Sequence, residues 1–205
     1  KGRDLGGVTH SARAGVQNSV VSLLFDKSKA TFDEDGILVD RFLVGDATAF
    51  EQLYGKYYDK VFAISRGILL DADEAADAVQ EIFTLVYRHL PRFDRRSKFS
   101  TWLFRISVNR SIQQARRVKY KSRLVDLDAA DHAAAPIEED TSDPRIEGVM
   151  AEMAPADRAL LTLFYWEELS LQEIADSLGC NVNAAKTRLY RARERFRLLY
   201  EREGV

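Results

Sequence analysis

Cysteine is almost absent from this chain, which has 205 residues and a single thiol, Cys180. One cysteine cannot form an internal disulfide, so the sequence excludes a disulfide-stapled fold and is typical of a reducing compartment. Long hydrophobic runs are also missing: no apolar stretch approaches the roughly 20 residues of a membrane-spanning helix, and Val20–Phe25 is far too short. We therefore expect a cytoplasmic protein that is not embedded in a membrane.

Residues with catalytic chemistry are scarce too. The three histidines, His10, His89 and His132, are scattered along the chain, and no Ser or Cys nucleophile has a nearby base as partner. An enzyme such as a recombinase or nuclease is therefore the weakest interpretation. We expect no enzymatic activity, no cofactor and no bound metal.

Alternating β-branched runs are few, whereas apolar residues recur at spacings of three and four from Asp35 onward. This period is that of one buried helix face, so the sequence predicts an all-α protein. The first predicted helix carries Ile37, Leu38, Phe42 and Leu43 inward and ends at Gly45. The next is long, and its predicted buried face is formed by Phe50, Leu53, Tyr54, Tyr57, Val61, Ile64, Ile68 and Leu69.

Helix boundaries are marked by residues that cap or interrupt a helix. Asp46 and Asp71 can accept hydrogen bonds from the first backbone N–H groups of the helices that follow them, and Ser100 is a candidate for the same role. Leu90-Pro91 is expected to stop a helix because proline restricts the residue before it. Pro144 and Pro155 stand where first helical residues are expected.

The composition changes between Val125 and Ser142, where acidic and small residues replace bulky apolar ones. Such a segment cannot build a packed core, so it predicts a flexible acidic linker between two small helical domains. We divide the chain into an N-terminal extension (1–34), a first helical domain (35–123), the linker (124–142) and a second helical domain (143–205).

The second domain ends in a helix-turn-helix pattern, LSLQEIADSLGCNVNAAKTRLYRARERF. Ser170 and Glu173 have the spacing of a capping box, and Gly179 can adopt the left-handed conformation that closes a short helix. The second helix of this unit exposes side chains that can donate to base edges or phosphates in a major groove. These are Asn183, Lys186, Thr187, Arg188, Tyr190 and Arg191. The alternative is a solvated basic helix in an ordinary bundle.

A second basic stretch runs from Arg92 to Arg123 and contains eleven Lys or Arg residues against one acidic residue, Asp94. The aromatic residues Phe93, Phe99, Trp102 and Phe104 are interleaved with these cations. Cations for the backbone and planar groups for unstacked bases are what single-stranded DNA requires, although Trp102 also has the spacing of a core residue. Two basic segments separated by an acidic linker predict a protein that binds DNA at two places.

Four segments in this order resemble the extracytoplasmic-function (sigma-E-like, RpoE-like, group 4) sigma factors of the sigma-70 family. They are GDATAFEQLYGKYYDKVF, DADEAADAVQEIFTLVYRHL, FSTWLFRISVNRSIQQARR and the helix-turn-helix stretch quoted above. The resemblance covers about residues 35–200. It implies sigma region 2 and region 4 domains, with bacterial RNA polymerase core and promoter DNA as partners. An anti-sigma factor, often membrane-anchored in this family, is implied as a further partner.

The resemblance also implies roles for individual residues. Asp77, Gln80 and Glu81 match the family's polymerase-binding motif; a divalent-metal cluster formed by Asp71, Asp73, Asp77 and Glu81 is the competing hypothesis. The match to the −10 region of the family consists of Lys98, Phe99, Ser100, Arg105 and Asn109, and the basic run after it adds Arg116 and Arg117. The helix after Cys180 is implied to read the −35 element, with Asn181 as its cap.

The chain departs from the family at the start of this reading helix. Relatives commonly have Gly-Thr-Val-Lys-Ser-Arg, whereas this chain has Asn183-Ala184-Ala185-Lys186-Thr187-Arg188. The change leaves the fold in place but alters which base edges or phosphates can be contacted, so the promoter sequence is open. A free-standing regulator that binds a palindromic operator as a dimer is the alternative function.

Overall fold

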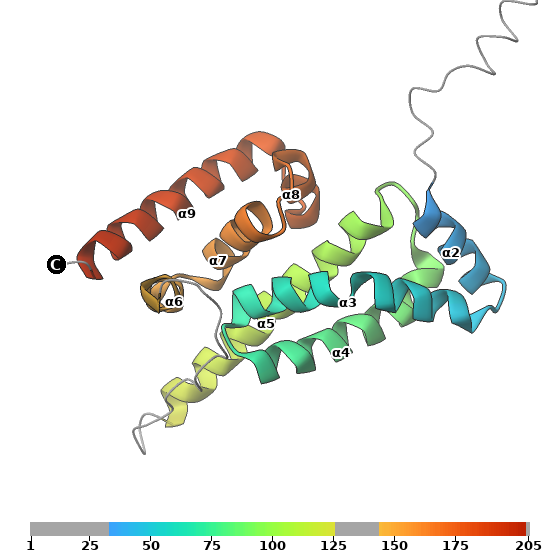
Figure 1. The fold of residues 1–205 in the computed structure, drawn as a ribbon, viewed down its shortest axis with the longest axis horizontal. Coiled ribbons are helices and arrows are strands. Elements are labelled where there is room, and N and C mark those ends of the chain that lie inside the picture. The colour runs from blue at the N-terminus through green and yellow to red at the C-terminus, as the bar shows by residue number, and fades with distance from the viewer. Residues whose placement is uncertain (1–32, 126–143, 204–205) are drawn as a thin grey trace, which may run out of the picture.

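The structure is a computed structural model that describes residues 33–125 and 144–203, and every element in these ranges is helical (Figure 1). The predicted extension (1–34) and acidic linker (124–142) lie almost entirely outside them. The first group of elements consists of α2 (Glu34–Leu43), α3 (Ala47–Leu69), α4 (Ala72–His89), the 3-10 turn η1 (Leu90–Arg92) and α5 (Phe99–Val125). The second consists of α6 (Pro144–Glu152), α7 (Pro155–Leu161), the π-helical turn η2 (Thr162–Trp166), α8 (Leu171–Leu178) and α9 (Val182–Glu203).

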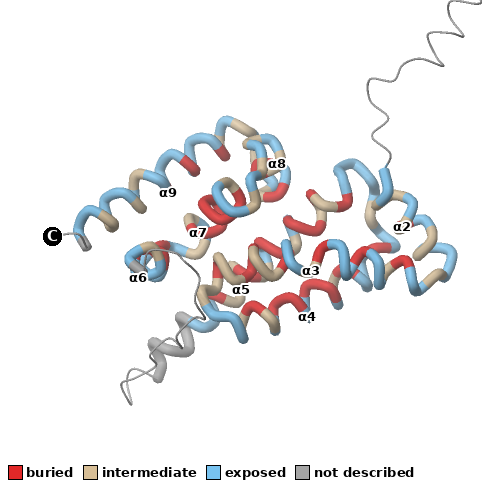
Figure 2. Tube along the Cα trace, in the orientation of Figure 1, coloured by how far each residue is buried: buried red, intermediate tan, exposed pale blue. Residues whose placement is uncertain are grey.

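The first group is a bundle in which α3, α4 and α5 pack against one another. The buried face of α3 follows the predicted stripe, with Leu53, Val61, Ile64 and Ile68 fully buried. Figure 2 shows the buried residues of these helices on the sides that face each other. Tyr54 departs from the stripe because its side chain remains 38% exposed.

Helix α2 packs on α3 with a different face from the one that the sequence predicts. Val39 is fully buried, whereas Ile37 and Leu43, both predicted to point inward, are exposed. The contacts of Asp35, in the first turn of α2, explain the orientation of the helix. Asp35 accepts a 2.5 Å hydrogen bond from the Tyr57 hydroxyl and pairs with Lys56 at 2.7 Å. Burial, followed by the bond to Asp35, raises the pKa of Tyr57 and keeps the phenol neutral.

The predicted caps are largely confirmed. The side chains of Asp46 and Asp71 accept from the backbone N–H groups of Thr48 and Glu74, and α4 gives way to a 3-10 turn at Leu90-Pro91. The prediction for Ser100 is wrong, because α5 already begins at Phe99 and Ser100 lies within its first turn.

The second group also has buried apolar residues that form its core. Ile174 and Ala175 of α8 and Ala185, Leu189 and Ala192 of α9 are buried, together with residues of α6 and α7. Helices α6, α7 and α8 all pack against α9. The two prolines begin α6 and α7, as predicted.

The two groups do not stand apart. Helix α8 packs against α5, and α7 with the η2 turn packs against α3, so that buried residues of both groups form one continuous hydrophobic cluster. Figure 1 shows the second group lying along one side of the α3–α5 bundle. The sequence predicts two separate cores and contains no signal for this contact.

Candidate nucleic-acid interface

Helix α9 presents the predicted reading residues on its outer surface. All of them are exposed: Asn181, Asn183, Lys186, Thr187, Arg188, Tyr190 and Arg191. At 100° per residue, Asn183, Thr187 and Tyr190 lie opposite the buried alanines and Leu189, with the cations on the flanks. Tyr190 is 63% exposed. The helix therefore offers amide, hydroxyl and cationic donors on one accessible side.

The turn before α9 sets the direction of this helix. Glu173 and Ser170 form the predicted capping box at the start of α8, and Gly179 ends α8 with φ 63°, a left-handed conformation that glycine adopts without strain. The Asn181 side chain accepts a 2.8 Å hydrogen bond from the Ala184 N–H. Asn181 therefore caps α9, in agreement with the role implied by the resemblance.

Helix α5 and the loop before it carry a basic surface. Lys98, Arg105, Asn109, Arg116 and Arg117 are exposed. Within the described part of the chain, the four cations among them form no ion pair with another side chain. Other cations of this stretch are neutralised locally, since Arg95 pairs with Asp40, Arg96 with Asp94 and Arg110 with Glu81. The free cations are the ones available to phosphates.

Two of the predicted −10 residues occupy other environments. Phe99 is only 3% exposed and packs on Tyr57, Phe93 and Trp102, so its ring supports the surface from beneath and does not reach DNA in this conformation. Ser100 is half-buried in the first turn of α5. Trp102 is also half-buried, against Phe93 and Phe99. Its side chain lines a cavity of about 700 Å³ that adjoins the basic surface.

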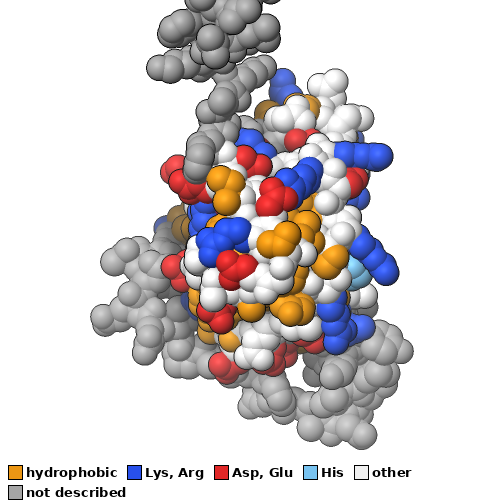
Figure 3. Space-filling model, turned by 90° about the vertical axis from the view of Figure 1, so that its right-hand side faces the viewer, with side chains coloured by type: hydrophobic (Ala, Val, Ile, Leu, Met, Phe, Trp, Pro, Cys, Tyr) orange, Lys and Arg blue, Asp and Glu red, His pale blue; other side chains and the backbone are white. Residues whose placement is uncertain are grey.

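A third candidate surface lies on α4, where Asp77, Gln80 and Glu81 are exposed. Glu81 is bound to Arg110 of α5, so it belongs to a local ion pair as well as to this face. Beside Gln80 is an aromatic groove of about 390 Å³, formed by Phe50, Tyr54, Phe83, Thr84, Tyr87 and Arg88. Figure 3 shows hydrophobic side chains gathered among charged ones on this end of the molecule.

The sequence reasoning missed the aromatic groove. The rings pack tightly, with centroids 4.5 Å apart for Tyr54 and Phe83 and 5.0 Å apart for Phe50 and Tyr87. Tyr87 remains 52% exposed despite these contacts. Phe83 and Tyr87 are one helical turn apart in the sequence, so they can meet on one face of α4, but helical periodicity alone predicts core positions for such residues.

Comparison with known proteins shows the family of the chain. Residues 53–120 match the family described as Sigma-70 region 2, and residues 145–196 match Sigma-70, region 4. RNA polymerase sigma-H factor of Pseudomonas aeruginosa is 34% identical over 80% of this chain and 92% of its own length. The chain belongs to the extracytoplasmic-function sigma factors of RNA polymerase. Other relatives are sigma factor SigW of Bacillus subtilis (31% identical; 75% of this chain, 89% of SigW) and sigma-E factor of Escherichia coli K12 (33%; 78% and 91%).

Solved structures of similar fold include two complexes. One is CnrH in complex with the cytosolic domain of CnrY, with a TM-score of 0.61, 23% identity and coverage of 82% of this chain and 97% of CnrH. The other is RpoE in complex with the anti-sigma factor NepR from Bartonella quintana, with a TM-score of 0.60, 22% identity and coverage of 74% and 96%. As a sigma factor, the protein binds core RNA polymerase and directs promoter-specific initiation of transcription.

The competing metal hypothesis finds no geometric support in the sigma factor. Among residues 33–125 and 144–203, no three His, Cys, Asp or Glu side chains converge on a site that could hold an ion. Asp71 instead caps α4, and Glu81 pairs with Arg110. No helix in the same ranges is long and apolar enough to cross a membrane.

The capping box offers a stability test of the helix-turn-helix in this sigma factor. Ser170→Ala is expected to lower the free energy of unfolding by about 0.5–2 kcal/mol at pH 7, because the hydroxyl accepts from the Glu173 N–H and donates to its carboxylate at 2.7 Å. Denaturant unfolding followed by circular dichroism measures the difference. Equal stability of the two proteins at pH 7 would contradict the cap.

The hydrogen bond from the Ser170 hydroxyl to the Glu173 carboxylate also makes the stability difference between wild type and Ser170→Ala depend on pH. The hydrogen bond from the Ser170 hydroxyl, followed by that from its N–H, lowers the pKa of Glu173. A lowered folded-state pKa stabilises the folded protein above the unfolded value of about 4.3, and this contribution is lost as the pH falls through the folded value. Part of the stability difference between wild type and Ser170→Ala is therefore expected to disappear below about pH 4. A constant difference from pH 7 to pH 3 would exclude the carboxylate from the effect.

Proposed function

We propose that the three surfaces divide the work of promoter recognition: the α4 face binds core polymerase, the basic surface of α5 holds the −10 strand, and α9 reads the −35 duplex. In this assignment residues 35–123 act as the region 2 domain and residues 143–205 as the region 4 domain. The observation that carries the proposal is the exposure of all seven candidate residues, six on α9 and Asn181 at its N-cap. A major groove accepts such a helix with its N-terminal half toward the base edges.

The −10 surface has the chemistry that an opened strand needs. Extruding a base costs a few kcal/mol of lost stacking, and no nucleotide hydrolysis is required if contacts with the protein supply that energy. Lys98 and Arg105 provide charge, while Ser100 and Asn109 provide hydrogen-bonding groups on the same helix or its edge. Trp102 stands in the wall of the adjoining cavity, where a flat side chain can stack on a base.

The polymerase-binding face combines polar and aromatic side chains. Gln80 borders the aromatic groove, so the two features form one continuous surface on α3 and α4. Exposed aromatic rings with polar neighbours are typical of protein–protein contacts. An anti-sigma factor, which could be membrane-anchored, would keep the protein inactive by covering this face. The similar complexes of CnrH with the cytosolic domain of CnrY and of RpoE with the anti-sigma factor NepR support such a partner. We place the protein in the cytoplasm, where polymerase acts.

The cations of α5 give the proposal a measurable consequence. The logarithm of the holoenzyme–promoter binding constant falls linearly with the logarithm of the salt concentration. Arg116→Ala and Arg117→Ala are each expected to make this negative slope shallower, by about 0.9 if the side chain contacts duplex and by about 0.7 if it contacts single strand. Filter binding over a salt series measures the slope. Arg197→Ala is the matched control, because Arg197 is already paired with Glu194 and Glu201. An unchanged slope for both α5 variants would remove this run from the DNA surface.

Run-off transcription on a library of randomised promoters tests the proposed function as a whole. Purified bacterial core polymerase is supplied with and without the protein, and the templates that yield transcripts are sequenced. Transcripts that require the protein and share two short elements at a fixed spacing are the expected result. The free-standing regulator predicts the opposite behaviour: no binding to core polymerase and tight binding of a symmetric duplex by the protein alone.

A further inference from the structure

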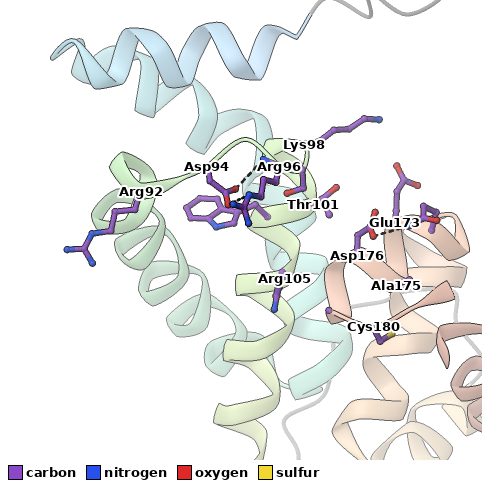
Figure 4. A pocket seen from close by; sticks show the side chains of 14 residues that line it. Arg92, Asp94, Arg96, Lys98, Thr101, Arg105, Glu173, Ala175, Asp176 and Cys180 are labelled. Carbon is purple, nitrogen blue, oxygen red and sulfur yellow. Dashed lines mark hydrogen bonds and ion pairs between the residues drawn. The ribbon is translucent and has the colours of Figure 1, made fainter. Parts of the chain in front are cut away.

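The aromatic groove of α3 and α4 differs in chemistry from the larger cavity at the basic surface. In the larger cavity, Lys98 and Arg105 share the walls with Glu173 and Asp176 (Figure 4). The groove is lined instead by four aromatic rings, and among the described residues of its wall only Arg88 carries a charge. Its chemistry therefore fits apolar side chains.

The apolar surface continues from the groove onto the end of α2. The ring of Phe42 lies 5.1 Å from that of Tyr87 and 5.6 Å from that of Phe50, measured between centroids. Leu43 and Val44, the next two residues of the chain, are exposed. A continuous exposed apolar surface of this kind marks a place where another segment or another protein binds.

The chain carries a short apolar segment that the proposed function does not use. Residues 20–25 have the sequence VVSLLF, in which five of the six side chains are large and apolar. They precede α2 and lie outside the described residues. Since apolar side chains leave water for an apolar surface within reach, this segment is a natural occupant of the groove.

The segment is close enough along the chain to reach the groove. Helix α2 begins at Glu34 and has 10 residues, so it is about 15 Å long, and Phe42 near its far end contacts the rim of the groove. Residues 26–32, which join the segment to α2, can span up to about 23 Å when extended. The connection is therefore longer than the path along α2.

A short connection also strengthens a contact that would be weak between separate molecules. Two groups joined by a short linker meet at an effective concentration in the millimolar range. The charges agree with such a contact as well, because Asp26 directly follows the segment and Arg88 lies in the wall of the groove.

From these observations we propose that residues 20–25 dock in the aromatic groove of the same chain. Leu23, Leu24 and Phe25, the largest side chains of the segment and the nearest to α2, fill the groove. The docking itself is independent of the proposed function, and only its consequence rests on that function. Because the groove adjoins Gln80 of the polymerase-binding face, the docked segment competes with core polymerase and lowers the affinity for it.

Paramagnetic broadening in the full chain tests the docking. A nitroxide is attached at Ser22→Cys in a Cys180→Ser background, so that every apolar side chain of the segment stays in place. The label is expected to broaden the amide signals of Thr84 and Tyr87. Leu24→Asp in the labelled protein is expected to restore both signals, because a carboxylate that enters an apolar groove loses its hydration. Sharp signals without that substitution would overturn the docking, as would broadening that persists with it.

Two further variants separate docking from the mere nearness of a tethered label. Leu198→Asp makes the same change at an exposed leucine of α9 and should leave the broadening as it is. Thr84→Lys places a cation in the groove and keeps a good helix former on α4, so the Tyr87 signal should become sharp. Broadening of Tyr87 that survives Thr84→Lys would contradict the proposed occupant.

A mixture of two samples identifies the source of the segment. Nitroxide-labelled protein that is invisible to the NMR experiment is added in equal amount to unlabelled, isotope-enriched protein. Sharp Thr84 and Tyr87 signals are expected in this mixture, because the docking is within one chain. Broadened signals would show that the segment of a second copy occupies the groove, and the inference would be wrong.

Binding of purified core polymerase provides the functional readout. If the groove is covered in about nine of ten molecules, Leu24→Asp should bind core polymerase about tenfold more tightly than wild type, whereas Leu198→Asp should bind it like wild type. Failure of the proposed function has a different signature. Broadening that disappears in Leu24→Asp without any gain in affinity confirms the docking and shows that the groove lies outside the polymerase contact.

Discussion

Replacing Leu103 with alanine is expected to reduce the free energy of unfolding by about 2–5 kcal/mol. Leu103 is fully buried where α5 meets the rest of the core, and removing three methyl-sized groups there forfeits both transfer free energy and packing contacts. Because a domain of this size is stable by only about 5–15 kcal/mol, the loss is a large fraction of the total. Urea unfolding followed by circular dichroism at 222 nm measures it.

The same substitution at an exposed leucine is the control. Leu198 on α9 is 59% exposed, so Leu198→Ala is expected to change stability by no more than about 0.5 kcal/mol. Transcription by the Leu103→Ala holoenzyme should fall as the folded fraction falls and recover at lower temperature. A destabilisation below about 1 kcal/mol would mean that the cavity collapses easily and that α5 is held mainly by other contacts.

Features set by neighbouring residues could be predicted from the sequence. The caps at Asp46 and Asp71, the capping box at Ser170 and the left-handed turn at Gly179 all involve groups within four residues of one another. The buried stripe of α3 follows from helical periodicity in the same way. The exposed side of α9 follows as well, since three small or apolar residues at spacings of three and four define its buried face.

Features set by distant residues could not be predicted. The orientation of α2 depends on Asp35 meeting Lys56 and Tyr57 about twenty positions away, and periodicity within α2 does not contain that information. The basic neighbours of Phe99 in the sequence predict a ring that faces DNA. The ring is instead buried by aromatic side chains that include Tyr57 of α3 and Phe93 of the preceding loop, which its local sequence does not reveal. The approach of Gly67 to Thr162 spans 95 positions in the sequence and leaves no local pattern.

Arg188→Ala is expected to weaken promoter binding by about 1–3 kcal/mol, or roughly fivefold to 150-fold, and to relax the preference at one position of the −35 element. Arg188 is exposed on the N-terminal half of α9, within reach of a base edge when that half lies in the major groove. Electrophoretic mobility shift with holoenzyme, on the selected promoter and on each single-base variant of its −35 element, measures both effects.

Arg197→Ala is the matched control for this substitution. Arg197 lies nine residues further along the same helix and pairs with Glu194 and Glu201, so its removal should leave the base preferences unchanged. The pattern across the promoter variants decides what Arg188 contacts. Loss of preference at a single base pair identifies a base edge, whereas equal weakening on every variant, accompanied by a lower salt slope, identifies a phosphate. Full binding on all variants would place the reading surface nearer Asn183 and Thr187, where this chain departs from the usual sequence of its family.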